Sequence, residues 1–154
     1  MKWGFSMRIS AKGRYALAAM IHMAQHTGTG EYITVISISE TLGISKIYLE
    51  QVFSLLKRGE LVNSVKGAQG GYQLTRMPKE ITAYDVLSAV ELSLFEKTED
   101  TVADRSPEMD KAMRLTVFDP LEQAARTSLQ GVTLYDLVTE TEKQKSAQGL
   151  MYFI

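Results

Sequence analysis

The chain of 154 residues contains no cysteine and no long hydrophobic run. Without cysteine, neither a disulfide framework nor a thiolate-ligated metal cluster can form. A membrane-spanning helix needs about 18 consecutive apolar residues, and no run in this sequence approaches that length. The first seven residues are too few for a secretory signal peptide. These absences predict a soluble protein with no membrane partner, located in the cytoplasm.

Signatures of catalysis are also missing. The sequence has no phosphate-binding loop, no nucleophile elbow and no histidine-containing triad with suitable spacing. His22 and His26 stand four residues apart, a spacing that can hold a metal ion on a helix, but the neighbouring sequence offers no third ligand. A structural role for the two histidines is the simpler interpretation. We therefore expect neither an enzyme nor a metal site.

A strong excess of either charge is missing overall, since the net charge is −1, but the two halves of the chain differ. Residues 1–76 carry nine basic and four acidic side chains, a net of +5, whereas residues 77–154 carry eight basic and fourteen acidic ones, a net of −6. A basic half can meet phosphates while the acidic half stays free for a partner or a ligand. Ordinary surface scatter is the alternative, but the basic residues cluster around one motif.

That motif is a helix-turn-helix. Apolar residues at three- and four-residue steps predict a helix over 10–26, which the glycines of segment 27–30 end. Thr34 can cap a helix over 35–42, although the β-branched residues there would suit a strand equally well. Helix is favoured because Gly43-Ile44-Ser45 then forms a tight turn, and Ser45 can cap a longer helix over 46–58.

A wing follows the motif. The sequence Val65-Lys66-Gly67-Ala68-Gln69-Gly70-Gly71-Tyr72-Gln73-Leu74 contains two short strand-like runs joined by a glycine-rich tip. Its three glycines permit a tight turn and a close approach to a surface, and Lys66 supplies positive charge at the base. The sequence therefore predicts a mainly α fold, a winged helix-turn-helix with a small two-stranded β wing that binds duplex DNA.

The helix over 46–58 has an outward face that can read bases. Gln51 can pair with adenine, Glu50 can accept from a cytosine amino group, and Lys46 or the helix N-terminus can hold phosphate. For any single residue, a solvated surface position is an equal alternative. A winged module that binds a protein instead of DNA is the alternative for the face as a whole.

The second half of the chain predicts three further helical segments. Thr82 can cap a helix that ends near Val90, and Ser106-Pro107-Glu108 is a strong helix start because proline suits the first turn. Asp119-Pro120 interrupts the apolar pattern that follows. Because proline lacks an N–H and disfavours helix before it, we expect a break or kink there, followed by helix to Leu129.

Three stretches together carry a resemblance to a known family. They are Met7-Arg8-Ile9-Ser10-Ala11-Lys12-Gly13-Arg14-Tyr15-Ala16, the series Ile44-Ser45, Tyr48-Leu49-Glu50-Gln51, Leu61-Val62 and Lys66-Gly67-Ala68-Gln69-Gly70-Gly71-Tyr72, and Val132-Thr133-Leu134-Tyr135-Asp136-Leu137. The chain resembles the Rrf-type bacterial transcription regulators, the family of the iron-sulfur cluster regulator, the nitric-oxide-sensing repressor and the cysteine-metabolism repressor.

The resemblance implies a homodimeric regulator, acting as a repressor, whose two winged domains read a palindromic promoter site. It places Tyr48, Glu50 and Gln51 in the recognition helix and Lys66 in the minor groove, while Ile47 occupies a position that is polar in some relatives. The residues predicted to contact double-stranded DNA are Lys12, Arg14, Ser45, Lys46, Tyr48, Glu50, Gln51, Lys66, Gly67, Gly70, Gly71 and Tyr72.

It also implies a division of the chain: a winged DNA-binding domain over 7–91, a linker or sensing loop over 92–106, a dimerisation helix and a C-terminal helix over 107–145, and a tail over 146–154. Iron-sulfur members carry three cysteines in the segment corresponding to about 92–107, and this chain has none. We therefore expect no cysteine-ligated iron-sulfur cluster. The effector is an unknown small molecule or a regulatory protein, acting through the segment from Leu92 to Pro120.

Overall fold

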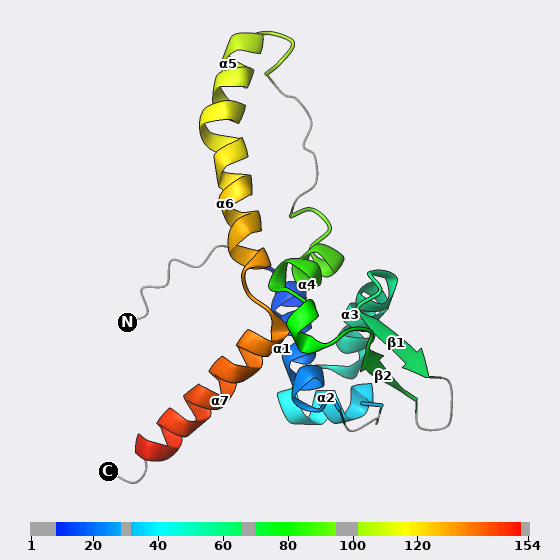
Figure 1. The fold of residues 1–154 in the computed structure, drawn as a ribbon. Coiled ribbons are helices and arrows are strands. Elements are labelled where there is room, and N and C mark those ends of the chain that lie inside the picture. Colours follow the sequence, from blue (N-terminus) through cyan, green and yellow to red (C-terminus); the bar gives the residue numbers. More distant parts are fainter. Residues whose placement is uncertain (1–8, 29–31, 66–69, 95–101, 152–154) are drawn as a thin grey trace.

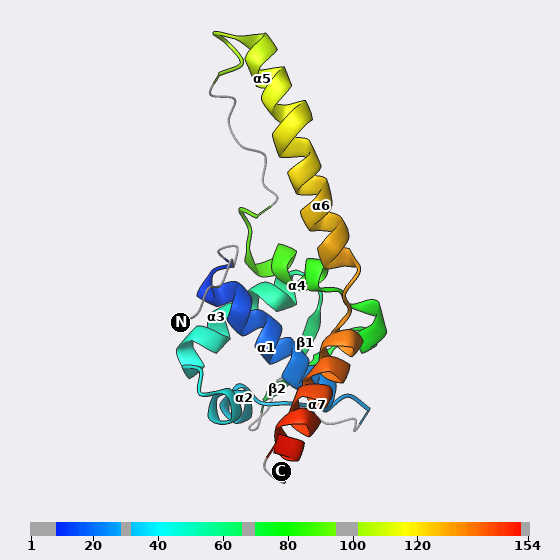
Figure 2. The ribbon, with the colours of Figure 1, turned by 90° about the vertical axis from the view of Figure 1, so that its left-hand side faces the viewer.

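The computed structural model describes residues 9–28, 32–65, 70–94 and 102–151. It consists of a packed body of helices with a two-stranded sheet at one side, from which one long helix projects (Figure 1). Helix α4 (Ala83–Val90) lies in the body, α5 (Pro107–Met113) lies at the far end of the projecting helix, and α6 (Asp119–Gln130) leads back to the body (Figure 2).

Three capped helices form the first part of the body. Helix α1 (Ala11–Gln25) begins at Ser10, whose hydroxyl accepts from the Gly13 N–H at 3.3 Å. Helix α2 (Val35–Leu42) begins at Thr34, and α3 (Lys46–Arg58) begins at Ser45. Each cap satisfies an N–H group that the first turn leaves without a partner. The caps at Thr34 and Ser45 confirm the helix-turn-helix prediction, including helix rather than strand over 35–42.

The turn between α2 and α3 depends on Gly43. Its φ is 68°, in the left-handed region, and its N–H closes α2 by donating to the Ser39 carbonyl at 2.8 Å. A residue with a side chain is strained in this conformation, so glycine lets α2 end and α3 start with only three residues between them.

The wing consists of β1 (Val62–Val65) and β2 (Gly71–Leu74), paired antiparallel from Val62 opposite Leu74 to Val65 opposite Gly71. Ile33 adds a bridge on the outer side of β2. Its N–H donates to the Tyr72 carbonyl at 2.9 Å, and the Tyr72 N–H donates back at 2.8 Å. The segment that leads into α2 is therefore hydrogen-bonded to the wing, and the predicted winged helix-turn-helix is confirmed.

A repeated motif joins the second half of the chain to the body. Thr82 caps α4 (Ala83–Val90), with Asp85 completing a capping box, and Thr133 and Asp136 make the same two hydrogen bonds at the start of α7 (Leu134–Met151). The two motifs lie against each other, because the Ala83 N–H donates to the Val132 carbonyl at 2.8 Å and the Leu134 N–H donates to the Ile81 carbonyl at 2.9 Å.

Cations from other elements cover the tyrosines of both motifs. Arg126 lies over the Tyr84 ring at 5.2 Å and donates to its hydroxyl at 2.6 Å, while the Lys79 ammonium of η1 (Pro78–Glu80) lies 4.6 Å from the Tyr135 ring centre. Contacts of this kind fix the base of the projecting helix and of α7 against the body.

The projecting helix differs from its prediction. Helix α5 (Pro107–Met113) begins at Pro107 as expected, but it continues through a π-helical turn, η2 (Arg114–Phe118), directly into α6 (Asp119–Gln130). Of the two outcomes expected at Asp119-Pro120, a break or a kink, the break is wrong: the helix is continuous, with a π-helical turn just before the proline. The Asp119 N–H donates to the Arg114 carbonyl, five residues back, so the turn before Pro120 is wider than an α turn. The wider turn accommodates a residue that has no N–H to donate, and the helix continues.

The C-terminal helix also exceeds its prediction. Helix α7 extends to Met151, six residues into the segment 146–154 that was expected to be a tail. Its first residue, Leu134, is completely buried in the core of the winged domain, so α7 packs against that domain. No helix in the described ranges is both long and apolar enough to cross a membrane.

Candidate nucleic-acid interface

Helix α3 presents two distinct faces. Leu49, Val52, Phe53 and Leu56 are completely buried in the core, whereas Lys46, Ile47, Glu50, Gln51 and Ser54 are exposed. The spacing of three and four residues places the exposed side chains along one stripe of the helix. The body therefore holds α3 by its apolar face and leaves the predicted reading face open.

Two of the predicted contacts are paired with each other. The Lys46 ammonium lies 3.8 Å from a Glu50 carboxylate oxygen, and both side chains are more than half exposed. A solvent-exposed ion pair contributes little stability, so either partner can exchange it for a group on DNA at low cost. Lys46 can then meet a phosphate and Glu50 a base amino group.

The first turn of α3 is held by a capping hydrogen bond from its own backbone and by a ring contact with α1. The Ser45 hydroxyl accepts from the Tyr48 N–H at 3.3 Å, so Ser45 acts as the helix cap. The Tyr48 ring packs edge-on against Tyr15 of α1 at 5.1 Å and is half-buried. Tyr48 therefore holds α3 against α1, with only part of its side chain accessible from outside.

An aromatic contact ties the wing to the reading helix. The rings of Phe53 in α3 and Tyr72 in β2 lie 4.5 Å apart with an interplanar angle of 34°. Burial raises the pKa of the Tyr72 hydroxyl, with a smaller contribution from the Glu50 carboxylate. Tyr72 thus lies between the core and the exposed face of α3, and it sets the angle between the helix and the wing.

The wing tip is described only in part. Lys66 and Gly67 lie outside the described residues, whereas Gly70 and Gly71 have φ values of 41° and 144°. A Cβ at Gly71 would stand 3.0 Å from Tyr32 Cβ and 3.1 Å from the Ile33 carbonyl oxygen. Gly71 is therefore required both for its backbone angle and for the close approach of β2 to the segment before α2.

Two predicted contact residues, Lys12 and Arg14, lie near the start of α1. Arg14 is exposed and Lys12 is half-buried. Just before them, the Glu91 carboxylate accepts hydrogen bonds from both the Ser10 N–H and the Ser10 hydroxyl. Glu91 ends α4, so this contact joins the start of α1 to the start of the segment 92–106.

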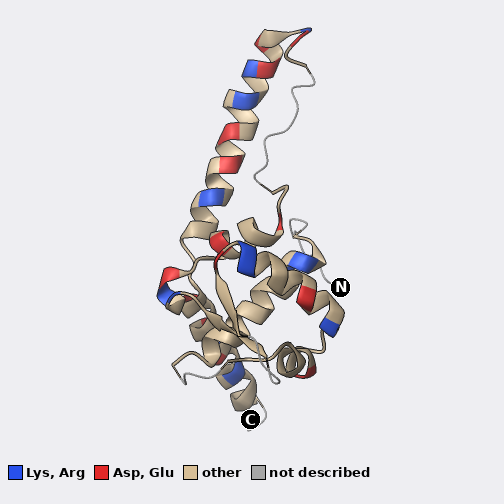
Figure 3. Ribbon diagram, turned by 90° about the vertical axis from the view of Figure 1, so that its right-hand side faces the viewer, with Lys and Arg blue, Asp and Glu red and all other residues tan. Residues whose placement is uncertain are grey.

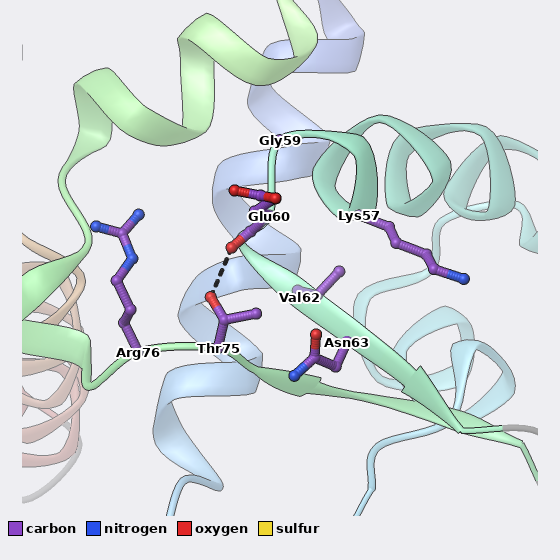
Figure 4. Close-up of a pocket in the computed structure, with 7 residues that line it drawn as sticks. All are labelled: Lys57, Gly59, Glu60, Val62, Asn63, Thr75 and Arg76. Atoms are coloured by element: carbon purple, nitrogen blue, oxygen red, sulfur yellow. Dashed lines mark hydrogen bonds between the residues drawn. The ribbon is translucent and has the colours of Figure 1, made fainter.

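Two hollows lie near the wing. The larger, about 610 Å³, is lined by Lys57, Gly59, Glu60, Val62, Asn63, Thr75 and Arg76. Lys57 and Arg76 point away from each other on opposite sides of it, and the hydrogen bond from the Thr75 hydroxyl to the Glu60 carbonyl lies between them (Figure 4). The second, about 420 Å³, has a mostly apolar lining between the end of α1 and β2.

The histidines of α1 form a pair within the fold. Their rings lie 4.5 Å apart, and a ring nitrogen of His26, Nδ1, lies 2.8 Å from the His22 carbonyl oxygen. Burial lowers the pKa of His22, and the neighbouring His26 lowers it further. Among the described residues, no three histidine or acidic side chains lie close enough together to hold a metal ion.

Sequence reasoning missed the residues that position the interface. Tyr15, Phe53 and Ile33 hold Tyr48, Tyr72 and β2 in place, and none of the three is among the predicted contact residues. The apolar spacing of α1 and α3 marked Tyr15 and Phe53 only as core residues. No local pattern shows which partner a core aromatic meets.

Comparison with known proteins gives a consistent result. A family model, Rrf2, described as an iron-dependent transcriptional regulator, matches residues 9–140. The chain is 38% identical over 136 residues to the transcriptional regulator IscR of Sodalis glossinidius, covering 88% of this chain and 81% of that protein. It is 35% identical over 150 residues to the regulator CymR of Bacillus subtilis, covering 96% of this chain and all of that protein.

Solved structures agree. IscR of T. potens superposes with a TM-score of 0.70 at 34% identity, covering 96% of this chain and 97% of that one. CymR of B. subtilis, the global cysteine regulator of that organism, superposes with a TM-score of 0.67 at 34% identity, covering 88% of this chain and 98% of that one.

Proposed function

Because the chain belongs to the Rrf2 family of DNA-binding transcription regulators, we propose that it is a repressor that binds a palindromic promoter site as a homodimer. Membership of the family makes the chain a transcription regulator and not an enzyme. The observation that carries the proposal is the exposed polar stripe of α3 beside the wing, held there by the Phe53 contact with Tyr72. The repressor acts in the cytoplasm, where bacterial DNA lies.

The predicted residues take separate roles at the DNA. Gln51 and Glu50 reach base edges in the major groove, where they can pair with adenine and with the cytosine amino group. Positive charge and helix N–H groups position the protein on phosphates, and the wing enters the minor groove with Lys66 at its base. Positioning involves Lys12, Arg14, Ser45, Lys46 and Tyr48, and close backbone approach at the wing involves Gly67, Gly70, Gly71 and Tyr72.

The projecting helix supports the homodimer. Five large apolar side chains on it are more than half exposed: Met109, Leu115, Val117, Phe118 and Leu121. Acidic and basic segments alternate along the same helix (Figure 3), including the pairs Asp110 with Arg114 and Glu122 with Arg126, each at 2.8 Å. A large exposed apolar surface with a polar rim is typical of an interface between subunits. A second copy would cover it and place two recognition helices on one two-fold DNA site.

The signal to which the regulator responds must be something other than a cysteine-ligated cluster. The matching family model is described as iron-dependent, and iron-sulfur clusters are held by thiolates, which this chain does not have. The histidine pair does not replace them, because His22 is buried and a ring nitrogen of His26 faces the His22 carbonyl. We propose instead that a small molecule or a partner protein acts through the segment from Leu92 to Pro120, whose start is held to α1 by the Glu91 contact with Ser10.

Direct binding measurements test the interface. A duplex selected from random sequences by the protein should be palindromic, and its affinity should fall steeply as salt rises, because phosphate contacts release counterions. Gln51→Ala and Glu50→Ala should relax the selected sequence by about 1 to 3 kcal/mol of discrimination at one position of each half-site. The matched variants Gln144→Ala and Glu140→Ala, exposed on α7, should select the same sequence as the parent. Affinity that does not depend on salt would contradict the proposal.

Two further measurements test the regulatory part. Transcription in vitro from a promoter that carries the selected site should decrease when the protein is added, and an increase would refute repression. Anaerobic reconstitution with iron and sulfide should give no stoichiometric cluster, and a stable cluster that alters DNA binding would overturn the proposed kind of signal.

A further inference from the structure

The reading face of α3 contains one side chain that cannot form hydrogen bonds. Ile47 is 71% exposed, the highest value for any large hydrophobic side chain among the described residues up to position 94. Its neighbours on the face are polar, and the buried side of the helix makes no use of it. An apolar side chain that points away from the core, in the first turn of a recognition helix, is placed where base edges are met.

The major groove offers such a side chain one apolar partner. Three of the four bases present only donors and acceptors there, whereas thymine also presents its C5 methyl group. Isoleucine can neither donate nor accept, and its branched Cβ restricts it to few rotamers, so it presents a fixed methyl surface. We infer that Ile47 reads the C5 methyl group of a thymine in each half of the DNA site. The inference rests on the proposed function of α3 and adds a base to what α3 recognises.

The position of Gln51 makes the inference more specific. Gln51 stands one helical turn after Ile47 on the same exposed stripe, about 6 Å further along the axis. Base pairs are about 3.4 Å apart, so the thymine read by Ile47 lies about two base pairs from the base read by Gln51. Each half-site should therefore contain a thymine at a fixed short distance from the Gln51 position.

Replacing thymine by uracil removes the methyl group and leaves every donor and acceptor in place. The selected palindromic duplex is remade with dU in place of each dT, one symmetric pair at a time, and the affinity of the full-length protein is measured. At one pair of positions the parent should lose about fourfold per half-site, the factor that one buried methyl group contributes. If no dU substitution changes the affinity, the inference is wrong.

Protein variants assign the effect to Ile47. Ile47→Ser should bind the dT and dU duplexes equally, because serine has no methyl group that could contact the C5 methyl group of thymine. The matched control is Ile36→Ser, which changes the same side chain at a 51% exposed position on α2 and should keep the parent's preference for dT. Retention of the dU penalty by Ile47→Ser would overturn the assignment, and circular dichroism checks that both variants are folded.

A modified cytosine supplies a test in the opposite direction. With dC in place of the thymine, the parent should bind more weakly, and 5-methyl-dC should restore part of the affinity for the parent but not for Ile47→Ser. Failure of 5-methyl-dC to restore the parent's binding would contradict the inference. A parent that binds no DNA at all would instead refute the proposed function, so the two failures can be distinguished.

Discussion

The winged body and the projecting helix use their apolar residues in opposite ways. In the body, side chains from α1, α2, α3, α4 and the first residue of α7 share one core, with Met20, Phe53 and Leu134 completely buried. Along the projecting helix, by contrast, no residue of the described segment 107–130 is buried. The body is stabilised by its own packing, whereas the projecting helix exposes apolar surface that no other described part of the chain covers.

This contrast separates two tasks within the chain. A rigid body keeps α3 and the wing at a fixed angle, which base reading requires. In the proposed homodimer, the projecting helix sets the distance between two such bodies. In that proposed dimer, a ligand or partner that moves the base of the helix, where Arg126 meets Tyr84, would change the spacing of the recognition helices without altering either reading face.

The largest effect is expected from charging the projecting helix. Phe118→Asp combined with Leu121→Asp removes two side chains that are 53% and 58% exposed in the single chain. Full burial of such a side chain contributes about 1.5 to 3 kcal/mol, and about half of that surface is left to cover. Loss of four such side chains from a dimer should therefore raise its dissociation constant by about 10²- to 10⁴-fold. Analytical ultracentrifugation measures the change.

The matched control places an acid on the same helix away from that pair. Gln123→Asp is also exposed and also adds a negative charge, and it should remain a dimer. DNA binding by the double variant should weaken in parallel with the loss of the dimer, while its thermal unfolding, measured on the monomer, stays cooperative. If the double variant sediments as a dimer, the projecting helix does not form the interface.

The next effect tests whether α7 is part of the body. Leu134→Ala empties a completely buried site and should lower the free energy of unfolding by about 2 to 5 kcal/mol. Leu150→Ala makes the same substitution near the end of α7, where the side chain is 66% exposed, and should change it by less than about 0.5 kcal/mol. Urea unfolding at one protein concentration compares them, and equal values would place Leu134 outside the core.

Local signals in the sequence predicted the body better than the projecting helix. Ser45, Thr34 and Thr82 act as caps where the pattern of hydroxyl residues before apolar runs placed them, because capping depends on a few adjacent residues. The glycine-rich segment before Tyr72 likewise predicted a two-stranded wing.

Two features were not predictable from local patterns. The helix continues through Pro120 because the wider π turn at Arg114–Phe118 accommodates a residue that has no backbone N–H. The sequence before the proline does not indicate this turn. The docking of Leu134 into the winged core is a contact between distant segments, although the similarity of Ile81-Thr82-Ala83-Tyr84-Asp85 to Val132-Thr133-Leu134-Tyr135-Asp136 shows that both helices begin alike. For the interface, the contact residues stay predictions, and the aromatic pairs that position them emerged only from the structure.

A smaller effect is expected at the wing. Gly71→Ala forces a side chain onto a residue with φ of 144° and brings Cβ to 3.0 Å from Tyr32, which should cost about 1 to 3 kcal/mol of stability and weaken DNA binding. Gly149→Ala makes the same change in α7, where nothing lies within 4 Å, and should stabilise the protein by up to about 1 kcal/mol. The unfolding temperature should therefore fall for Gly71→Ala and rise for Gly149→Ala, and only Gly71→Ala should weaken DNA binding in a titration. A stabilising Gly71→Ala would show that the wing is not held as described.

The smallest effect concerns the pH dependence of the body. Burial, and secondarily His26, holds the pKa of His22 below its usual value of 6.5. The folded state therefore binds fewer protons than the unfolded state once the pH falls below about 6.5, so the free energy of unfolding should decrease as the pH is lowered and level off below the depressed pKa.

His22→Met fills the same buried site without a titrating group, and its curve should lack this decrease. His26→Gln keeps His22 and removes only the second cause, so it should retain a reduced decrease. Urea unfolding between pH 8 and pH 5 compares the three proteins, and parallel curves for the parent and His22→Met would show that the histidine in the core does not titrate on unfolding.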